Sequence, residues 1–211
     1  MKKFSSSMMG LALVLSVAAC KTTGNQTMDA NSGANQKHLF VDVHQLEPGK
    51  VPLEAVAQAH QKDLQTQGKY GVNIQKYWVD QTAGKVYCLA EASDSASLYN
   101  THKEAHGLVP QSIREVSGGL ESTSNLNAPL FLDVHHLGEG KVSAKAVAKA
   151  HKRDLAVQSK YNANFVNYWF DKKAGTVMCL VQAKDSAAIA NIHKEAHGLL
   201  PNEVHKVKEG L

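Results

Sequence analysis

Pairs of histidines stand at a spacing that suits metal binding. His102 and His106 are four residues apart, and His193 and His197 repeat the pattern later in the chain. Side chains four apart on a helix lie on the same face, so both imidazoles of a pair can reach one ion. Each pair belongs to the motif His-Lys-Glu-Ala-His, whose glutamate is one position too late for a zinc protease. The pattern therefore predicts metal binding rather than that kind of hydrolysis.

The two histidine pairs belong to a duplicated sequence. A shift of 91 residues aligns Leu39–Val116 with Leu130–Val207 without a gap, and 42 of the 78 aligned pairs are identical. Cys88 then faces Cys179. Because about half of all positions recur, the recurrence of ligand-type residues favours a site without establishing one. The duplication itself predicts two copies of one structural unit.

Each copy has the pattern of a small α+β unit. In the first copy, residues 39–44, 74–79, 86–92 and 113–116 resemble strands. One helix is expected to open at Pro52, and another to run from Asp94 or Ser95 to Gly107. This βαββαβ order is typical of ferredoxin-like folds. A sheet with helices on one face leaves its other face bare, so two tandem copies predict an internal pseudo-dimer.

This topology brings residues of ligand type to one end of each repeat. The end of the first strand, the start of the third strand and the end of the second helix meet there, which places His44 near Cys88. Imidazole and thiolate groups are ligands of transition metals. The expected metal ligands are His44, Cys88, His102 and His106 in the first repeat, and His135, Cys179, His193 and His197 in the second.

Two other histidines are expected to be structural. His60 and His151 lie on the apolar stripe of the first helix of each repeat, which predicts hydrogen-bonded core histidines. The pair Tyr77-Trp78 is expected to pack at the rim rather than to hold a cofactor. The sequence contains no Gly-x-Ser-x-Gly, phosphate-binding loop or Cys-x-x-Cys motif.

The N-terminus is typical of a bacterial lipoprotein precursor. Lys2 and Lys3 precede a short apolar run that ends in small residues and Cys20. The stretch Val17-Ala18-Ala19-Cys20 resembles a lipobox, so residues 1–19 are expected to be a signal peptide and Cys20 to be acylated. Several acyl chains would anchor the protein stably on a membrane. By resemblance to enterobacterial sorting rules, Lys21 favours the outer membrane, with the protein facing the periplasm.

The mature chain divides into four expected parts. A lipidated flexible tether covers residues 20–37, repeat 1 covers 38–117, a linker covers 118–128, and repeat 2 covers 129–211. The formal net charge of the whole chain is +4. Loss of the two signal-peptide lysines leaves a charge too small to indicate a nucleic-acid-binding surface.

A set of spaced motifs resembles one known family. Asp-Val-His, Ala-His, Tyr-Gly-Val, Tyr-Trp, Val-x-Cys-Leu and His-x-x-Ala-His-Gly-Leu occur in this order in the first repeat, and most recur in the second. Together they are similar to the bacterial domain of unknown function 4242, which includes a ferredoxin-like, dimeric nickel-binding protein. The resemblance implies dimer-like sheet pairing and a histidine-rich nickel site. By matching motif, its candidate ligands are His44, His102, His106, His135, His193 and His197.

Three functions remain open at this point. The first is a lipid-anchored transition-metal-binding protein that acts as a buffer, sensor or scavenger, with nickel, copper or zinc as its ion. The second is a small-molecule binder or enzyme of the dimeric α/β-barrel type, with Asp42, His44 and Tyr77 as acid or base. The third is a structural lipoprotein without a site. The repeats are expected to pair with each other, and a further homo-oligomer is left open.

Overall fold

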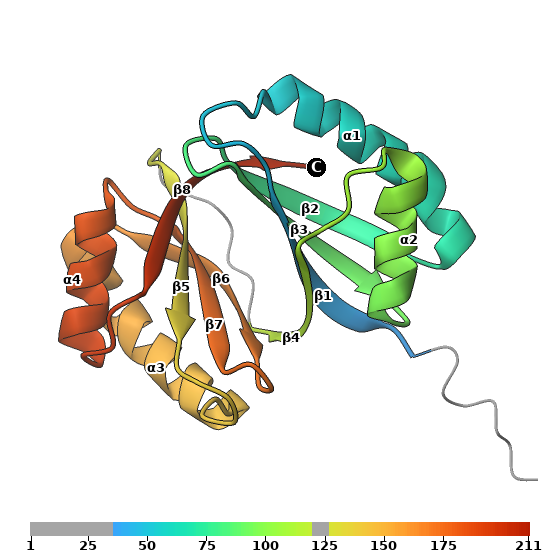
Figure 1. Ribbon diagram of the computed structural model, residues 1–211. Coiled ribbons are helices and arrows are strands. Elements are labelled where there is room, and N and C mark those ends of the chain that lie inside the picture. The colour runs from blue at the N-terminus through green and yellow to red at the C-terminus, as the bar shows by residue number, and fades with distance from the viewer. Residues whose placement is uncertain (1–35, 120–126) are drawn as a thin grey trace, which may run out of the picture. The chain divides into compact units, whose positions relative to one another are not determined.

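The computed structural model describes residues 36–119 and 127–211 (Figure 1). The expected signal peptide, Cys20, most of the tether and most of the linker lie outside these residues. The described part contains two tandem repeats of α+β structure. In each repeat the order of elements is β, α, β, β, α, β, with a short 3₁₀ turn after the first helix.

The two repeats have matching elements of nearly the same length. The first consists of β1 (His38–Gln45), α1 (Leu53–Thr66), η1 (Gln67–Tyr70), β2 (Asn73–Asp80), β3 (Lys85–Ala92), α2 (Ser95–Ala105) and β4 (Ser112–Gly118). The second consists of β5 (Leu130–His136), α3 (Ala144–Val157), η2 (Gln158–Tyr161), β6 (Asn164–Asp171), β7 (Thr176–Gln182), α4 (Ser186–Ala196) and β8 (Glu203–Gly210).

Local sequence signals account for the ends of α2. The carboxylate of Asp94 accepts a hydrogen bond of 2.7 Å from the backbone N–H of Ser97, which satisfies one of the free donors at the helix start. At the other end Gly107 has a φ of 79°, a left-handed conformation that glycine adopts without strain. The helix therefore ends at a fixed place: His102 lies in its last turn, and His106 is the capping residue just after it.

The eight strands form one closed barrel. Their order is β1-β3-β2-β8-β5-β7-β6-β4, so the last strand of each repeat pairs with a strand of the other repeat. Tyr77 of β2 pairs with Gly210 of β8, and Gly118 of β4 pairs with Trp169 of β6. Closure of the barrel leaves no strand edge unpaired at these junctions.

The sheet separates two hydrophobic clusters, one inside the barrel and one between the sheet and the helices. Val41 of β1 packs inside the barrel, in a cluster that also contains Trp78 and Trp169, whose rings lie 5.1 Å apart. Phe40, the preceding residue, points to the opposite face and packs with Leu98 of α2. The alternation along β1 thus decides which side chains face the helices. Within the described residues, no helix has both the length and the apolar character needed to cross a membrane.

Candidate metal centre

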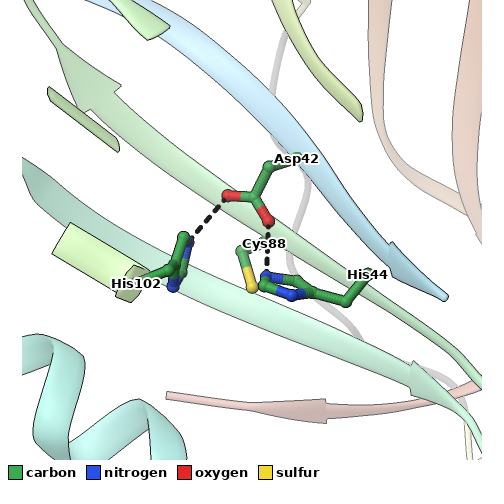
Figure 2. A group of neighbouring side chains, drawn as sticks. All are labelled: Asp42, His44, Cys88 and His102. Carbon is green, nitrogen blue, oxygen red and sulfur yellow. Dashed lines mark hydrogen bonds and ion pairs between the residues drawn. The ribbon is translucent and has the colours of Figure 1, made fainter. Parts of the chain in front are cut away.

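Four buried side chains of ligand type converge in the first repeat. They are Asp42, His44, Cys88 and His102, and their ligand atoms all lie within 4.8 Å of one another. Figure 2 shows the carboxylate of Asp42 between the two imidazoles, with the sulfur of Cys88 beside His44. Carboxylate, imidazole and thiolate are all ligands that transition metals accept.

Three elements position this cluster. Asp42 and His44 are two residues apart on β1 and therefore point to the same, helix-covered face of the sheet. Cys88 of β3 is the cross-strand partner of Asp42. His102 reaches the same place from the last turn of α2. The cluster thus depends on strand register and on the packing of α2 against the sheet.

His102 lies between two buried carboxylates. Its Nε2 is 3.2 Å from Oδ2 of Asp42, and its Nδ1 is 3.0 Å from Oδ1 of Asp63 on α1. Burial alone would lower the pKa of His102, but the hydrogen bonds and charges of Asp42 and Asp63 outweigh it and raise the pKa to about 9. Without metal, His102 is therefore an imidazolium at neutral pH.

The pKa values of the two carboxylates shift in the opposite direction, downward. Burial would raise the pKa of Asp63, but hydrogen bonds with His102 and His106 outweigh it and lower the pKa to about 2. Burial would likewise raise the pKa of Asp42, but its contacts with the imidazoles of His102 and His44 outweigh burial and lower the pKa. Both carboxylates are thus anionic at neutral pH, as metal ligands must be.

His106 joins this network through Asp63. The backbone N–H of Leu108 donates a hydrogen bond of 3.1 Å to Nδ1 of His106, and Nε2 of His106 lies 3.3 Å from Oδ2 of Asp63. A neutral His106 therefore carries its proton on Nε2, toward the carboxylate. The group Asp63, His102 and His106 is a second set of ligand atoms within 4.8 Å, and it shares His102 with the first.

One oxygen of Asp42 is left without a hydrogen bond. Nε2 of His44 lies 3.1 Å from Oδ1 of Asp42, within ion-pair distance, yet this buried oxygen has no partner of hydrogen-bond geometry. A buried, anionic oxygen with spare acceptor capacity is costly unless it is paired. The donor set therefore fits a cation held among Asp42, His44, Cys88 and His102.

The second repeat reproduces both groups. They consist of Asp133, His135, Cys179 and His193, and of Asp154, His193 and His197. Hydrogen bonds with Asp133 and Asp154 again outweigh burial and raise the pKa of His193 to about 9. The buried Oδ1 of Asp133 likewise has no hydrogen-bond partner. One contact is particular to this repeat, where Nδ1 of His193 is 3.1 Å from Nε2 of His197.

Both cysteines of the described residues are free and buried. Burial is the largest cause that raises the pKa of the Cys88 thiol well above 9, and the charges of Asp42 and Asp63 add to it. The pKa of Cys179 is raised for the corresponding reasons. Each thiol is thus protonated at neutral pH, and only a bound cation would favour the thiolate.

The structure brings together His44, Cys88 and His102, whereas His106 meets them only through His102. The same division holds for His135, Cys179, His193 and His197. Sequence reasoning weighed Asp42 only as an acid or base, and it missed Asp63 and Asp154 altogether. A signal for Asp63 existed, because an acidic residue follows His60 by three positions, one helical turn away on the stripe assigned to the core, and the duplication keeps it.

The prediction for His60 was wrong in one respect. The side chain is 3% exposed and its ring lies 4.8 Å from that of Tyr77, as expected of a core residue. However, its Nδ1 has no hydrogen-bond partner, and the same is true of Nδ1 of His151. Both residues also border a pocket, although Nδ1 itself is inaccessible to solvent in each.

Solved structures show only limited overall similarity. SCO4226 from Streptomyces coelicolor A3(2) is 32% identical, and the match covers 36% of this chain and 93% of that chain with a TM-score of 0.35. A putative monooxygenase from Lactobacillus acidophilus NCFM is 7% identical, with 82% and 93% of the two chains covered and a TM-score of 0.47. A chlorite dismutase from Candidatus Nitrospira defluvii, solved with imidazole, is 8% identical, with coverages of 85% and 91% and a TM-score of 0.47.

The family comparison is decisive. No curated protein matches the chain significantly. The model of the family described as nickel responsive protein SCO4226-like matches twice, over residues 40–116 and 131–207. These are the two repeats, so the resemblance inferred from the spaced motifs is confirmed. The chain belongs to the SCO4226-like family of nickel-responsive proteins and carries the family domain twice.

Proposed function

We propose that the protein is a membrane-anchored, periplasm-facing binding protein for a transition metal, with one ion per repeat. The observation that carries the proposal is the convergence of Asp42, His44, Cys88 and His102, whose ligand atoms lie within 4.8 Å of one another. The same residue types converge in the second repeat. Membership of a nickel-responsive family favours nickel over copper and zinc, which imidazole would also bind.

The first-repeat ion would be held by His44, His102, Cys88 and Asp42. Such a cation would replace the proton that His102 now shares with the carboxylates, and it would favour the thiolate of Cys88. Binding should therefore release protons and weaken as the pH falls. A buffer or scavenger of this kind must bind its ion reversibly. A site whose ligands are protonated without metal suits this role, because protons compete with the ion for the same ligands.

The architecture supports the same proposal. We interpret each repeat as a ferredoxin-like unit and the barrel as the internal equivalent of a dimer. Two sites on one chain would then correspond to the two halves of a symmetric assembly. The lipobox at Cys20 would keep both sites beside the membrane, and the outer membrane is favoured by Lys21.

The decisive experiment is metal stoichiometry. The untagged protein should bind two nickel ions in calorimetry and elemental analysis. His44→Ala and His135→Ala should each remove one ion, and the double variant should remove both. His38→Ala is the matched control, because this partly exposed histidine pairs with Glu115 outside both clusters. Two ions bound with unchanged affinity by the double variant would refute the proposed ligands.

Anchoring needs its own test. Cys20→Ser should abolish labelling by radioactive palmitate and release the protein from the membrane fraction. The wild-type protein should remain with the outer membrane after fractionation. Wild-type protein that is fully soluble without detergent would contradict the lipobox, independently of any result on metal.

A further inference from the structure

The proposed metal ligands of each repeat border a pocket. In the first repeat the pocket has a volume of about 120 Å³, and His44 and Cys88 form part of its wall. The pocket of the second repeat has a volume of about 180 Å³, and its wall includes the equivalent residues His135 and Cys179. An ion held at either centre would therefore lie next to a pocket.

The carboxylate of the first centre lies away from this pocket. Asp42 is completely buried and is not part of the pocket wall. Its Oδ2 is 3.2 Å from Nε2 of His102, the contact that Figure 2 marks on the left of the carboxylate. An ion among the four donors would thus have Asp42 on its buried side and the pocket beside His44 and Cys88.

Two further polar side chains border the pocket but belong to another set of contacts. Nδ1 of His106 accepts a hydrogen bond of 3.1 Å from the backbone N–H of Leu108, and its Nε2 lies 3.3 Å from Oδ2 of Asp63. Asp63 in turn meets Nδ1 of His102, whereas Asp42 meets Nε2 of the same ring. Asp63 and His106 therefore lie at the other nitrogen of His102 and not among the four donors.

The rest of the wall offers the ion few donors. Most of the side chains that complete it are apolar, and they include Val51, Val56 and Val86. Structural metal sites are closed by protein ligands, whereas sites that act on a further molecule leave one position to it. The pocket gives each metal centre such an open side, so the donor on this side would come from a molecule outside the protein.

The size and lining of the pocket define the class of this molecule. An apolar cavity of about 150 Å³ takes up benzene, so a five-membered ring with a short side chain fits a pocket of this volume. Contact with the three valines favours a molecule with an apolar part. The carboxylate of Asp63 in the wall would repel an anion, and transfer of an unpaired charge onto apolar walls is unfavourable. The lining thus favours a small, uncharged, partly apolar donor.

We propose that each repeat binds its transition metal together with one small, uncharged organic molecule, which donates a nitrogen atom to the ion and places its apolar part in the pocket. The inference rests on the proposed function and adds the class of the second ligand. The pocket is then the open side of the metal centre and not a site of its own. Without the ion the molecule loses its main attachment, so it should bind only to the metal-loaded protein.

The test titrates the nickel-loaded full chain with substituted imidazoles. The chain carries Cys20→Ser, so that no detergent is needed. Both 1-methylimidazole and 1-ethylimidazole should saturate at one molecule per nickel ion and shift the visible absorption bands of the metal. The ethyl compound should bind about fourfold more tightly, the ratio expected for one more buried methylene group. Imidazol-1-ylacetate is similar in size but anionic, and it should bind at least about tenfold more weakly. The metal-free chain should bind none of them.

Variants that fill the pocket separate the molecule from the ion. Ala59 of α1 and Ala150 of α3 are half-buried and belong to the walls of the two pockets. Ala59→Leu and Ala150→Leu should each abolish the spectral shift at one centre while both nickel ions stay bound. Gln58→Leu is the matched control, because it adds the same side chain at an exposed position of α1 outside the wall.

The outcomes distinguish this proposal from the proposed function. Two bound nickel ions whose spectrum neither imidazole changes would overturn the proposal alone, because the centres would then be closed. A chain that binds no nickel would overturn both. Equal affinities for the methyl and ethyl compounds would also overturn the proposal, since the apolar part would not enter the pocket. These titrations need only the parent chain, so they decide the matter even if a variant does not fold.

Discussion

Nε2 of His102 lies 3.2 Å from Oδ2 of Asp42, and both side chains are completely buried. On the other side of its ring, His102 forms a second ion pair with Asp63. One imidazolium therefore pairs with two carboxylates, one from β1 and one from α1. The contact therefore joins the two helices of the repeat to the sheet. It also places a proton where the proposed metal would bind.

Removal of this imidazole should be costly to the metal-free protein. His102→Leu leaves the charges of Asp42 and Asp63 buried without their shared partner, which typically costs about 3–5 kcal/mol. Urea denaturation without metal should show the loss. The partly exposed pair of His38 and Glu115 is the control, since His38→Ala should cost less than about 1 kcal/mol. Equal stability of wild type and His102→Leu would show that the buried pair contributes nothing.

The same contacts predict a pH dependence of the metal-free protein. His102 faces Asp42, Asp63, His44 and His106, and its pKa is raised from 6.5 to about 9 in the folded state. A raised pKa stabilises the fold fully below the unfolded value of about 6.5, and this contribution is lost as the pH rises through 9.

Asp63 acts at the other end of the pH range. Its pKa is lowered to about 2, so its contribution is present above about pH 4 and is lost as the pH falls toward 2. The free energy of unfolding should therefore be highest between about pH 4 and 6.5 and decline on both sides. Denaturation at a series of pH values measures this, and His102→Leu should flatten the alkaline decline. An alkaline decline of the same size in that variant would assign it to other groups.

An isolated repeat should not be a stable monomer. A segment of residues 38–118 would lose the pairing of β2 with β8 and of β4 with β6, and would expose Trp78 from the barrel interior. Unpaired edges and a bare apolar face both favour association. Sedimentation should show dimers or aggregates, whereas the parent chain serves as the control. A well-folded monomeric segment would show that the repeats do not depend on each other.

Gly210 of β8 is expected to tolerate no side chain. A Cβ placed there would lie 2.0 Å from Cζ of Tyr77, so the two repeats approach too closely for any other residue. Gly210→Val should therefore destabilise the protein by about 1–3 kcal/mol, the usual effect of overpacking.

Gly68 provides the matched control, because nothing lies within 4 Å of a Cβ built on it and its φ is not positive. Gly68→Ala should be neutral or slightly stabilising. Thermal denaturation of both variants tests the contrast. A melting temperature unchanged by Gly210→Val would mean that β8 does not pack tightly against Tyr77 in solution.

Much of the local structure could be predicted from the residues alone. The alternation along 39–44 predicted a strand, and in the structure β1 covers these residues, with Asp42 and His44 on the face opposite Val41. The duplication and the α+β content were equally apparent. These features depend on periodicity and on capping residues such as Asp94, which act over a few positions. Local interactions are sufficient to specify them.

Long-range contacts decided the rest. No pattern along the chain indicated that β8 would pair with β2, because the sequence of a single strand does not specify which strand lies beside it in a barrel. Asp63 was not among the predicted site residues, because it meets His102 only across 39 positions of the chain. The surroundings of His60 likewise depend on how α1 packs against the sheet, where the ring of His60 lies beside that of Tyr77. The sequence determined two copies of one unit with ligand-type residues on known faces, whereas only tertiary packing determined which carboxylates the histidines meet and where a pocket remains.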